Sequence, residues 1–373
     1  MKKILFVTGT RADFGKLKSL ISKVDVHSDF EADIFITGMH MIARYGMTAI
    51  EVEKAGFKSL YKYINQNEHD SMDVILSKTI QGLSDYVKET KPDLLVIHGD
   101  RVEAMAGSIV GALNNILVAH IEGGEVSGTI DELIRHSVSK MSHIHFVSND
   151  LARQRLLQLG ENDSSIFVIG SPDLDIMTSN RLPNLCEVKK RYQIPFEDYA
   201  VFMYHPVTTE LDELSSNISN SVDALIASEE NYIVIYPNND HGSEVIIKEL
   251  MRLKNNHRFK VFPSVRFECF LTLLKNAKFM IGNSSAGVRE MPFYGKVSIN
   301  LGSRQAGRAK AASILNAEED ELSILDKISR VKLQEFEAEK EFGDGNSDNL
   351  FLEIINTSSF WETPRQKVFV DMQ

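Results

Sequence analysis

The sequence contains little cysteine and no long hydrophobic run. Two cysteines, Cys186 and Cys269, among 373 residues cannot build a disulfide framework, so we expect reduced thiols in a cytoplasmic protein. No stretch approaches the roughly 18 apolar residues of a membrane span. The apolar run that follows Met1 is shorter than the roughly 7–15 residues of a signal peptide. We therefore expect no membrane association.

Positive charge is also scarce. The chain has 41 Lys and Arg against 52 Asp and Glu, a net charge of -11, which argues against a nucleic-acid partner or an anionic membrane surface. An anionic ligand would have to be held by a few placed arginines and helix N-termini. A length of 373 residues suits two domains rather than one core.

Short apolar runs alternate with segments of helical spacing in the first half, which predicts a parallel sheet covered on both faces. The expected strands are Ile4–Thr8, Ala32–Thr37, Leu94–His98, Leu117–Ile121, Ile144–Val147 and Ile166–Ile169. The expected helices are Phe14–Val24, Met72–Lys88, Val102–Leu113, Ile130–Met141 and Leu151–Leu159. This pattern indicates a Rossmann-like, doubly wound α/β domain.

A second alternating series follows the polar stretch Ser179–Pro195, which we interpret as a domain crossover. Its expected strands are Ala200–Tyr204, Tyr232–Tyr236, Lys260–Pro263, Phe279–Ile281 and Val297–Leu301. Its expected helices are Leu211–Ser228, Ser243–Asn255, Phe267–Asn276 and Ala286–Tyr294. We predict an N-terminal domain over 1–172 and a C-terminal domain over 173–350, facing each other across a cleft, with a helix in 351–373 that packs back on the first.

Three carboxylates mark the first half. Asp100 and Glu122 each follow an expected strand, and Asp131 lies in the first turn of an expected helix, after a capping box of Thr129 and Glu132. Because the carboxyl ends of parallel strands share one edge of a sheet, these acids should gather there and suit proton transfer. A purely structural role for Asp131 is an i,i+4 ion pair with Arg135.

A metal site of His98, Asp100, His120 and Glu122 is an alternative use of the same segment. The alternation disfavours it, because His98 ends the strand while Asp100 already lies in the loop. We predict no metal. His40, His136, His143 and His145 fit structural roles.

Two further segments suit an anion. Gly9 follows the first strand and precedes a helix, with Arg11 placed to contact a diphosphate. In the second half, Ser284 and Ser285 follow a strand at a helix start, and Glu290 lies where a carboxylate can accept both hydroxyls of a ribose. Structural readings are a tight turn and an ordinary capped helix. Strand-end positions add three residues to the candidate site: His205, Asn238 and Arg304.

Several of these motifs together resemble a known family, the hydrolysing UDP-N-acetylglucosamine 2-epimerases. They are Gly9-Thr-Arg-Ala-Asp-Phe-Gly-Lys-Leu17, His98-Gly-Asp-Arg101, His120-Ile-Glu-Gly-Gly-Glu125, the Asp131 helix and Gly282-Asn-Ser-Ser-Ala-Gly-Val-Arg-Glu290. The resemblance implies a GT-B-like fold of two Rossmann-like domains. It also implies conversion of UDP-N-acetylglucosamine to N-acetylmannosamine and UDP, a first step toward sialic acids and capsule polysaccharides. No cofactor and a homodimer are further implications.

Carried over by position, the resemblance makes Asp100, Glu122 and Asp131 the catalytic acids. The UDP-binding positions would be Arg11, Arg101, His205, Asn238, Ser284, Ser285, Glu290 and Arg304. Which acid removes and which delivers a proton stays open.

Four alternatives remain. A close subgroup uses UDP-N,N'-diacetylbacillosamine. Non-hydrolysing relatives resemble Gly-Thr-Arg-Pro-Glu where this chain has Gly9-Thr-Arg-Ala-Asp13. A GT-B glycosyltransferase would share the nucleotide site but would not invert C2. A sugar-nucleotide sensor without catalysis is the non-enzyme option.

Overall fold

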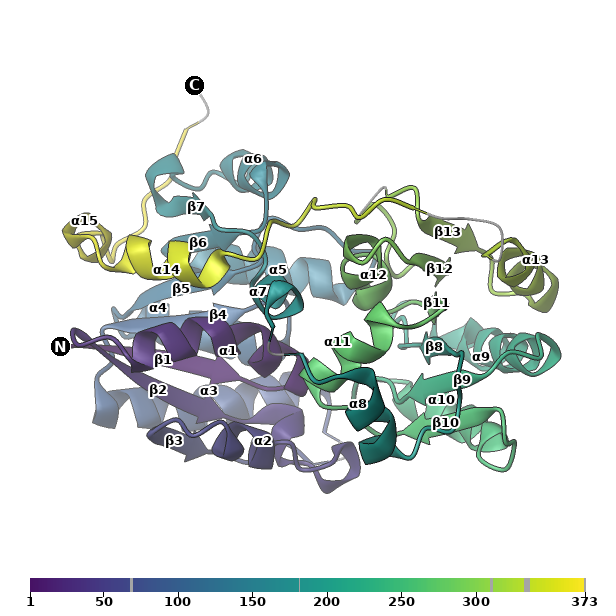
Figure 1. Ribbon diagram of the computed structural model, residues 1–373. Coiled ribbons are helices and arrows are strands. Elements are labelled where there is room, and N and C mark those ends of the chain that lie inside the picture. The colour runs from purple at the N-terminus through teal and green to yellow at the C-terminus, as the bar shows by residue number, and fades with distance from the viewer. Residues whose placement is uncertain (68–69, 181, 309–310, 332–335, 372–373) are drawn as a thin grey trace. The chain divides into compact units, whose positions relative to one another are not determined.

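The computed structural model describes residues 1–67, 70–180, 182–308, 311–331 and 336–371 (Figure 1). The chain divides into two compact units. The first comprises Met1–Glu125, Asp131–Asn180 and Glu341–Gln373, and the second comprises Val126–Ile130 and Arg181–Lys340. The first unit thus reaches past the expected boundary at residue 172. The reason is that α7 (Pro172–Thr178) packs against α1 (Arg11–Asp25).

The first unit is built on a seven-stranded parallel sheet, as the alternation predicts. Its order is β3-β2-β1-β4-β5-β6-β7. The strands are β1 (Lys2–Thr8), β2 (Phe30–Ile36), β3 (Ser59–Lys62), β4 (Leu94–His98), β5 (Leu117–Ile121), β6 (Ile144–Val147) and β7 (Ile166–Val168). Only β3 was not expected, because this short edge strand is half-exposed and lacks a buried apolar run.

The second unit carries a six-stranded parallel sheet in the order β10-β9-β8-β11-β12-β13. The strands are β8 (Ala200–Met203), β9 (Tyr232–Ile235), β10 (Phe259–Phe262), β11 (Phe279–Gly282), β12 (Val297–Leu301) and β13 (Ile314–Ala317). Counted from the first strand of each unit, both sheets contain the order 3-2-1-4-5-6 of the Rossmann fold, so the prediction of two doubly wound domains is confirmed.

Helices and short 3-10 turns connect the strands of the first unit. Besides α1 and α7 they are η1 (Gly38–Met41), η2 (Ala43–Tyr45), α2 (Ala49–Lys54), α3 (Met72–Thr90), α4 (Val102–Leu113), α5 (Ile130–Met141), α6 (Asp150–Gln158), η3 (Asp163–Ser165), α14 (Ser347–Ile355) and α15 (Ser358–Trp361). Helix α14 packs on α1, and its buried Phe351 lies 6.5 Å from the ring of Phe6 and 4.9 Å from that of Phe146.

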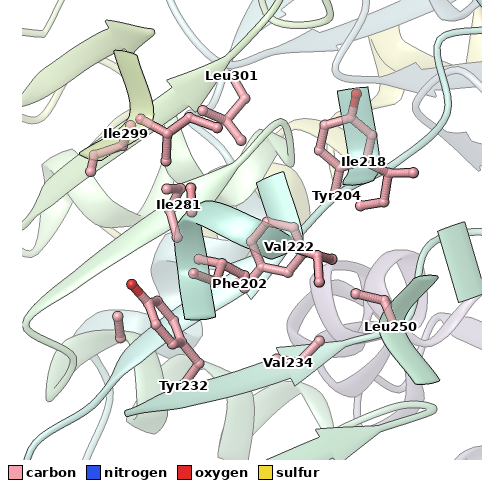
Figure 2. Packing of buried hydrophobic residues seen from close by; sticks show 14 of the residues in the cluster. Phe202, Tyr204, Ile218, Val222, Tyr232, Val234, Leu250, Ile281, Ile299 and Leu301 are labelled. Carbon is pink, nitrogen blue, oxygen red and sulfur yellow. The ribbon is translucent and has the colours of Figure 1, made fainter. Parts of the chain in front are cut away.

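The second unit has its own core, part of which is shown in Figure 2. Phe202 and Tyr232 from the sheet pack there with Ile218 and Val222 of α9. The helices and turns are α8 (Leu185–Tyr192), α9 (Leu211–Ala227), α10 (Ser243–Leu250), η4 (Met251–Leu253), α11 (Phe267–Lys275), η5 (Ser285–Gly287), α12 (Glu290–Phe293) and α13 (Glu321–Val331). Helix α8 was missed because it lies in the polar stretch interpreted as a crossover.

The expected continuous helix Ala286–Tyr294 is wrong. The segment forms η5, a break at Val288 and Arg289, and the four-residue α12. Pro292 explains the break: in a continuous helix its ring would clash with the carbonyl of Val288 and it could not donate a hydrogen bond. Glu290 therefore begins a separate short helix.

Among the described residues, no helix combines the length and the apolar character needed to cross a membrane.

Gly282, the last residue of β11, lies where the strands of the second sheet are closely packed, and a substitution there tests this packing. Its φ is +132°, and a Cβ atom there would lie 2.0 Å from the carbonyl oxygen of Met203 on β8. We expect Gly282→Ala to lower the free energy of unfolding by about 3 kcal/mol or more, measured by urea denaturation. Gly307→Ala is the control, because φ there is +73° with nothing within 4 Å. Equal losses in both variants would contradict this packing constraint.

Two buried histidines make stability depend on pH. Burial lowers the pKa of His40 to about 4 and that of His120 to about 3, against 6.5 in an unfolded chain. The unfolded chain therefore takes up protons that the folded chain does not, so this stability is complete above pH 6.5 and is lost as the pH falls toward 4 and 3.

We expect the free energy of unfolding to fall less in His40→Gln than in the wild type between pH 7 and pH 5. The difference should be about 2 kcal/mol, measured by urea denaturation at both pH values. The exposed His257→Gln is the control. A His40→Gln slope equal to that of the wild type would contradict the assignment.

Candidate active site

Several of the candidate residues follow the strands at the two places where the sheet order reverses. In the first unit these strands are β1, which leads to Arg11, and β4, which leads to Asp100 and Arg101. In the second unit they are β8, which leads to His205, and β11, which leads to Ser284. Ligands of open α/β sheets bind beyond the carboxyl ends of the strands at such switch points.

The charges of the three predicted acids raise the pKa of one buried arginine, Arg135 of α5. Its side chain is 1% exposed, and its Nη2 forms an ion pair with Oδ2 of Asp100. Burial alone would lower the pKa of Arg135, but the nearby charges of Asp100, Glu125, Asp131 and Glu122 raise it. We call these residues the Arg135 cluster. They provide a charged group of acids around one fixed cation.

Glu122 is also held by a second buried group. Nζ of Lys16 lies 3.0 and 3.3 Å from its two carboxylate oxygens, and the hydroxyl of Ser171 donates to Oε1 at 2.7 Å. Nε2 of His98 lies 3.2 Å from Oε2, and Asp173 lies 3.7 Å from Nζ of Lys16. Donors on both oxygens favour the ionised carboxylate.

The backbone of Glu122 has a conformation that side chains rarely adopt. Its φ is +65°, and its N–H donates to the carbonyl of Phe146 at 3.0 Å. The two glycines that follow are required by close packing, since a Cβ at Gly123 would lie 2.8 Å from Ser139 Oγ and one at Gly124 would lie 2.2 Å from the carbonyl of Ala152. Strain of this kind collects at functional positions.

The alternative metal site is not assembled. His120 uses both ring nitrogens inside the protein, one with the carbonyl of Gly99 at 2.8 Å and the other with Ser139 at 3.0 Å. Asp100 is paired with Arg135. Within the described parts of the chain, no group of three or more His, Cys, Asp or Glu is arranged to hold a metal ion.

The four histidines assigned structural roles all bond within the first unit. His40 contacts Thr8 and Thr48, and His145 contacts Glu161. His136 pairs with Glu132 at 3.4 Å, and His143 accepts from Val118 N–H and donates to the carbonyl of Arg365.

The loop after β1 is organised by Asp13 rather than left open. Its carboxylate accepts the backbone N–H groups of Gly9 and Thr10, each at 2.9 Å, and the hydroxyl of Thr8 at 2.8 Å. The amides at the start of α1 that we expected to approach a phosphate therefore bond to the protein. Arg11 donates to Glu51 at 2.8 Å.

Arg101 is the N-cap residue of α4, and its Nε lies 3.6 Å from Oε2 of the buried Glu103. A Cβ at Gly9 or Gly38 would lie within 3 Å of the Glu103 carboxyl group, so both glycines make room for it.

In the second unit, Asn283 joins the ends of β8 and β11. Its side chain accepts the N–H of His205 at 2.6 Å and donates to the carbonyl of His205 at 2.8 Å. Nδ1 of His205 accepts the backbone N–H of Asn238 at 3.0 Å, so in the neutral ring Nε2 carries the proton. His205 is 4% exposed and is held as a donor.

Arg304 and Gln305, after β12, converge on the same segment. Both donate to the carbonyl of Asn283, at 3.2 and 2.9 Å. Ser284 caps η5 and accepts from the N–H of Ala286, Ser285 begins η5, and Glu290 is 4% exposed. The second-unit residues predicted for UDP therefore follow four neighbouring strands of one sheet, which lie in the order β9, β8, β11 and β12.

Sequence reasoning missed Lys16, Ser171 and Asp173. Lys16 belongs to the motif that begins at Gly9. Its position on the buried face of an amphipathic helix was the signal that could have identified it. Ser171 and Asp173 lie just after β7, the last strand of the first sheet, and no local sequence pattern links them to Glu122.

Comparison with known proteins identifies the family of the chain. The sequence profile of the family described as UDP-N-acetylglucosamine 2-epimerase matches residues 22–356. The chain is similar to the UDP-N-acetylglucosamine 2-epimerase of Neisseria meningitidis serogroup B, with 48% identity over 100% of both chains. It is 33% identical to the GDP/UDP-N,N'-diacetylbacillosamine 2-epimerase (hydrolyzing) of Campylobacter jejuni, over 86% of this chain and 85% of that relative.

A solved structure supports the same architecture. The crystal structure of a UDP-GlcNAc 2-epimerase from Neisseria meningitidis bound to UDP-GlcNAc superposes with a TM-score of 0.81 at 20% identity, covering 95% of this chain and 99% of that one. This likeness confirms the predicted GT-B-like fold class. With the profile and the 48% identical relative, it follows that the chain belongs to the UDP-N-acetylglucosamine 2-epimerase family.

Proposed function

We propose that the protein is a hydrolysing 2-epimerase that converts UDP-N-acetylglucosamine to N-acetylmannosamine and UDP. The observation that carries this proposal is the Arg135 cluster, in which the three proposed catalytic acids and Glu125 lie around one buried cation. The relative at 48% identity bears the name UDP-N-acetylglucosamine 2-epimerase, which supports the substrate and the epimerisation. Hydrolysis is favoured by the Campylobacter jejuni relative, whose name includes it, and by the motif Gly9-Thr-Arg-Ala-Asp13.

The chemistry explains why several acids are needed. The C2 proton of the sugar has no adjacent carbonyl to acidify it, so its removal must accompany departure of UDP from C1. A carboxylate takes the C2 proton, the C–H electrons form the C1–C2 double bond, and the C1–O bond breaks with its electrons leaving on UDP. The resulting 2-acetamidoglycal then adds water at C1 and a proton at C2 from the opposite face.

Asp100 and Glu122 fit the base role, because each has a cationic partner that favours its ionised form. Asp131, in the first turn of α5, supplies the further acid that hydration requires. Fixed cations cost no reorganisation during reaction, so the Arg135 and Lys16 side chains keep these carboxylates in place as charge moves.

The second unit fits the uridine diphosphate. His205 is oriented as a hydrogen-bond donor, and Arg304 and Ser284 are gathered around Asn283. Together they suit the departing diphosphate, and Glu290 suits the ribose hydroxyls. Arg11 and Arg101 of the first unit stay proposed UDP contacts, each beside a carboxylate.

UDP-N,N'-diacetylbacillosamine is the second candidate substrate, favoured by the name of the Campylobacter jejuni relative. Incubating the protein with either sugar nucleotide in heavy water, followed by proton NMR, separates the readings. We expect free N-acetylmannosamine with deuterium at C2 and stoichiometric UDP from UDP-N-acetylglucosamine. Accumulation of UDP-N-acetylmannosamine would identify a non-hydrolysing epimerase, and product without C2 deuterium would contradict epimerisation. Faster turnover of the bacillosamine nucleotide would select the second candidate.

Variants should separate catalysis from nucleotide binding. We expect Asp100→Asn, Glu122→Gln and Asp131→Asn each to lower kcat by about 10²- to 10⁴-fold while UDP affinity changes little, because these acids act on the hexose. Glu290→Gln should instead weaken UDP binding by about 10-fold in calorimetry. Glu213→Gln, exposed on α9, is the control. Wild-type kcat in any of the three acid variants would remove that acid from the mechanism.

A further inference from the structure

The far end of the helix that carries Asp131 and Arg135 is capped by a lysine from a distant part of the chain. The last carbonyls of a helix have no partner within it. At the end of α5, Nζ of Lys367 donates to the carbonyls of Ser139 at 3.4 Å, Lys140 at 2.9 Å and Ser142 at 2.7 Å. A cation there also complements the negative end of the helix dipole.

Lys367 is itself fixed by a buried acid. It forms an ion pair with Oε2 of Glu161, whose side chain is 1% exposed, and the same oxygen lies 2.9 Å from Nε2 of His145 on β6. Burial alone would raise the pKa of Glu161, but His145 and Lys367 lower it to about 2. Lys140 of α5 reaches the other oxygen of Glu161 at 3.1 Å. One carboxylate thus connects β6, the end of α5 and the C-terminal segment.

The C-terminal segment has further anchors on the same unit. Nε2 of His143 donates to the carbonyl of Arg365 at 2.9 Å. Before it, Phe360 of α15 is buried and Nε1 of Trp361 donates to the carbonyl of Ile355 at 2.7 Å. The chain after α15 then runs past β6 and β7 toward α6, as Figure 1 shows. Lys367 therefore reaches α5 from a fixed backbone.

We propose that Lys367 is a positioning residue for the reaction, acting through α5 on Asp131 and Arg135; this rests on the proposed function. The twelve residues of α5 span roughly 18 Å as one rigid rod. Arg135 is 1% exposed and paired with Asp100, so a shift or rotation of the rod changes the separation of the acids it neutralises.

The location of the contacts separates this role from substrate binding. Within the part of the chain that the structure describes, the hydrogen bonds of the Lys367 ammonium go to the end of α5 and to Glu161. It bonds to none of the residues proposed to hold UDP. Its loss should therefore change the rate of the chemical step and not nucleotide affinity.

The test compares Lys367→Met with Lys367→Arg, which keeps the charge and several N–H donors. We expect Lys367→Met to lower kcat on UDP-N-acetylglucosamine by about 10- to 100-fold, with KM and UDP affinity within about twofold of the wild type. Lys367→Arg should recover most of that loss. Lys62→Met is the control, since Lys62 forms a surface ion pair with Glu53 on another part of the unit.

Amide hydrogen exchange gives a readout that does not need turnover. Exchange at residues 139–142 should be faster in Lys367→Met than in the wild type, and unchanged in Lys62→Met. If Lys367→Met does not fold, Lys367→Gln, which keeps two donors, takes its place in both measurements.

Three results would overturn the proposal. Unaltered exchange at 139–142 would show that Lys367 does not hold α5. Faster exchange with wild-type kcat, or a kcat loss matched by an equal rise in KM, would show that holding α5 does not position the acids. A wild-type protein that does not turn over UDP-N-acetylglucosamine would refute the proposed function instead, and the exchange measurement would still decide whether the cap exists.

Discussion

A guanidinium buried to 1% exposure needs negative charge around it, and in this chain that need organises the candidate active site. Arg135 comes from α5, and the carboxylates that raise its pKa come from the loop after β4, the loop after β5 and the first turn of α5 itself. Without the arginine, like charges this close would repel one another. With it, acids from three segments keep a fixed arrangement.

The two units share one strand order but carry different groups of candidate residues. In both, the sheet order reverses beside its first strand, and the side chains of interest follow the strands on each side of the reversal. In the first unit the start of α1 is occupied by Asp13, which bonds the amides that a phosphate would need. In the second, the candidate nucleotide region follows β11, on the other side of the reversal, and is built from Asn283, Ser284 and the donors that converge on them. The proposed division between acids and nucleotide follows from this difference.

Strand ends could be predicted because periodicity locates buried strands, and parallel topology then brings Asp100 and Glu122 to one edge. Partners could not be predicted in the same way. Helical spacing offered a pair of Asp131 with Arg135 as an alternative structural role, but it could not predict the ion pair of Arg135 with Asp100, from another loop. Lys16 of α1 and Glu122, after β5, lie 106 positions apart in the sequence, so their contact depends on tertiary packing that no local pattern reveals. Pro292 could have predicted the break before α12. The helical spacing of this segment instead favoured one continuous helix.

The positive φ of Glu122 has an evolutionary consequence. Glycine adopts φ of +65° freely, whereas a side chain there costs about 1–2 kcal/mol, so glycine would relieve backbone strain at residue 122. It would also delete the carboxylate held by Lys16 and Ser171. Selection for stability therefore does not favour glycine at residue 122, because loss of the carboxylate from the buried Lys16 would cost about 3–5 kcal/mol, more than the strain that glycine relieves.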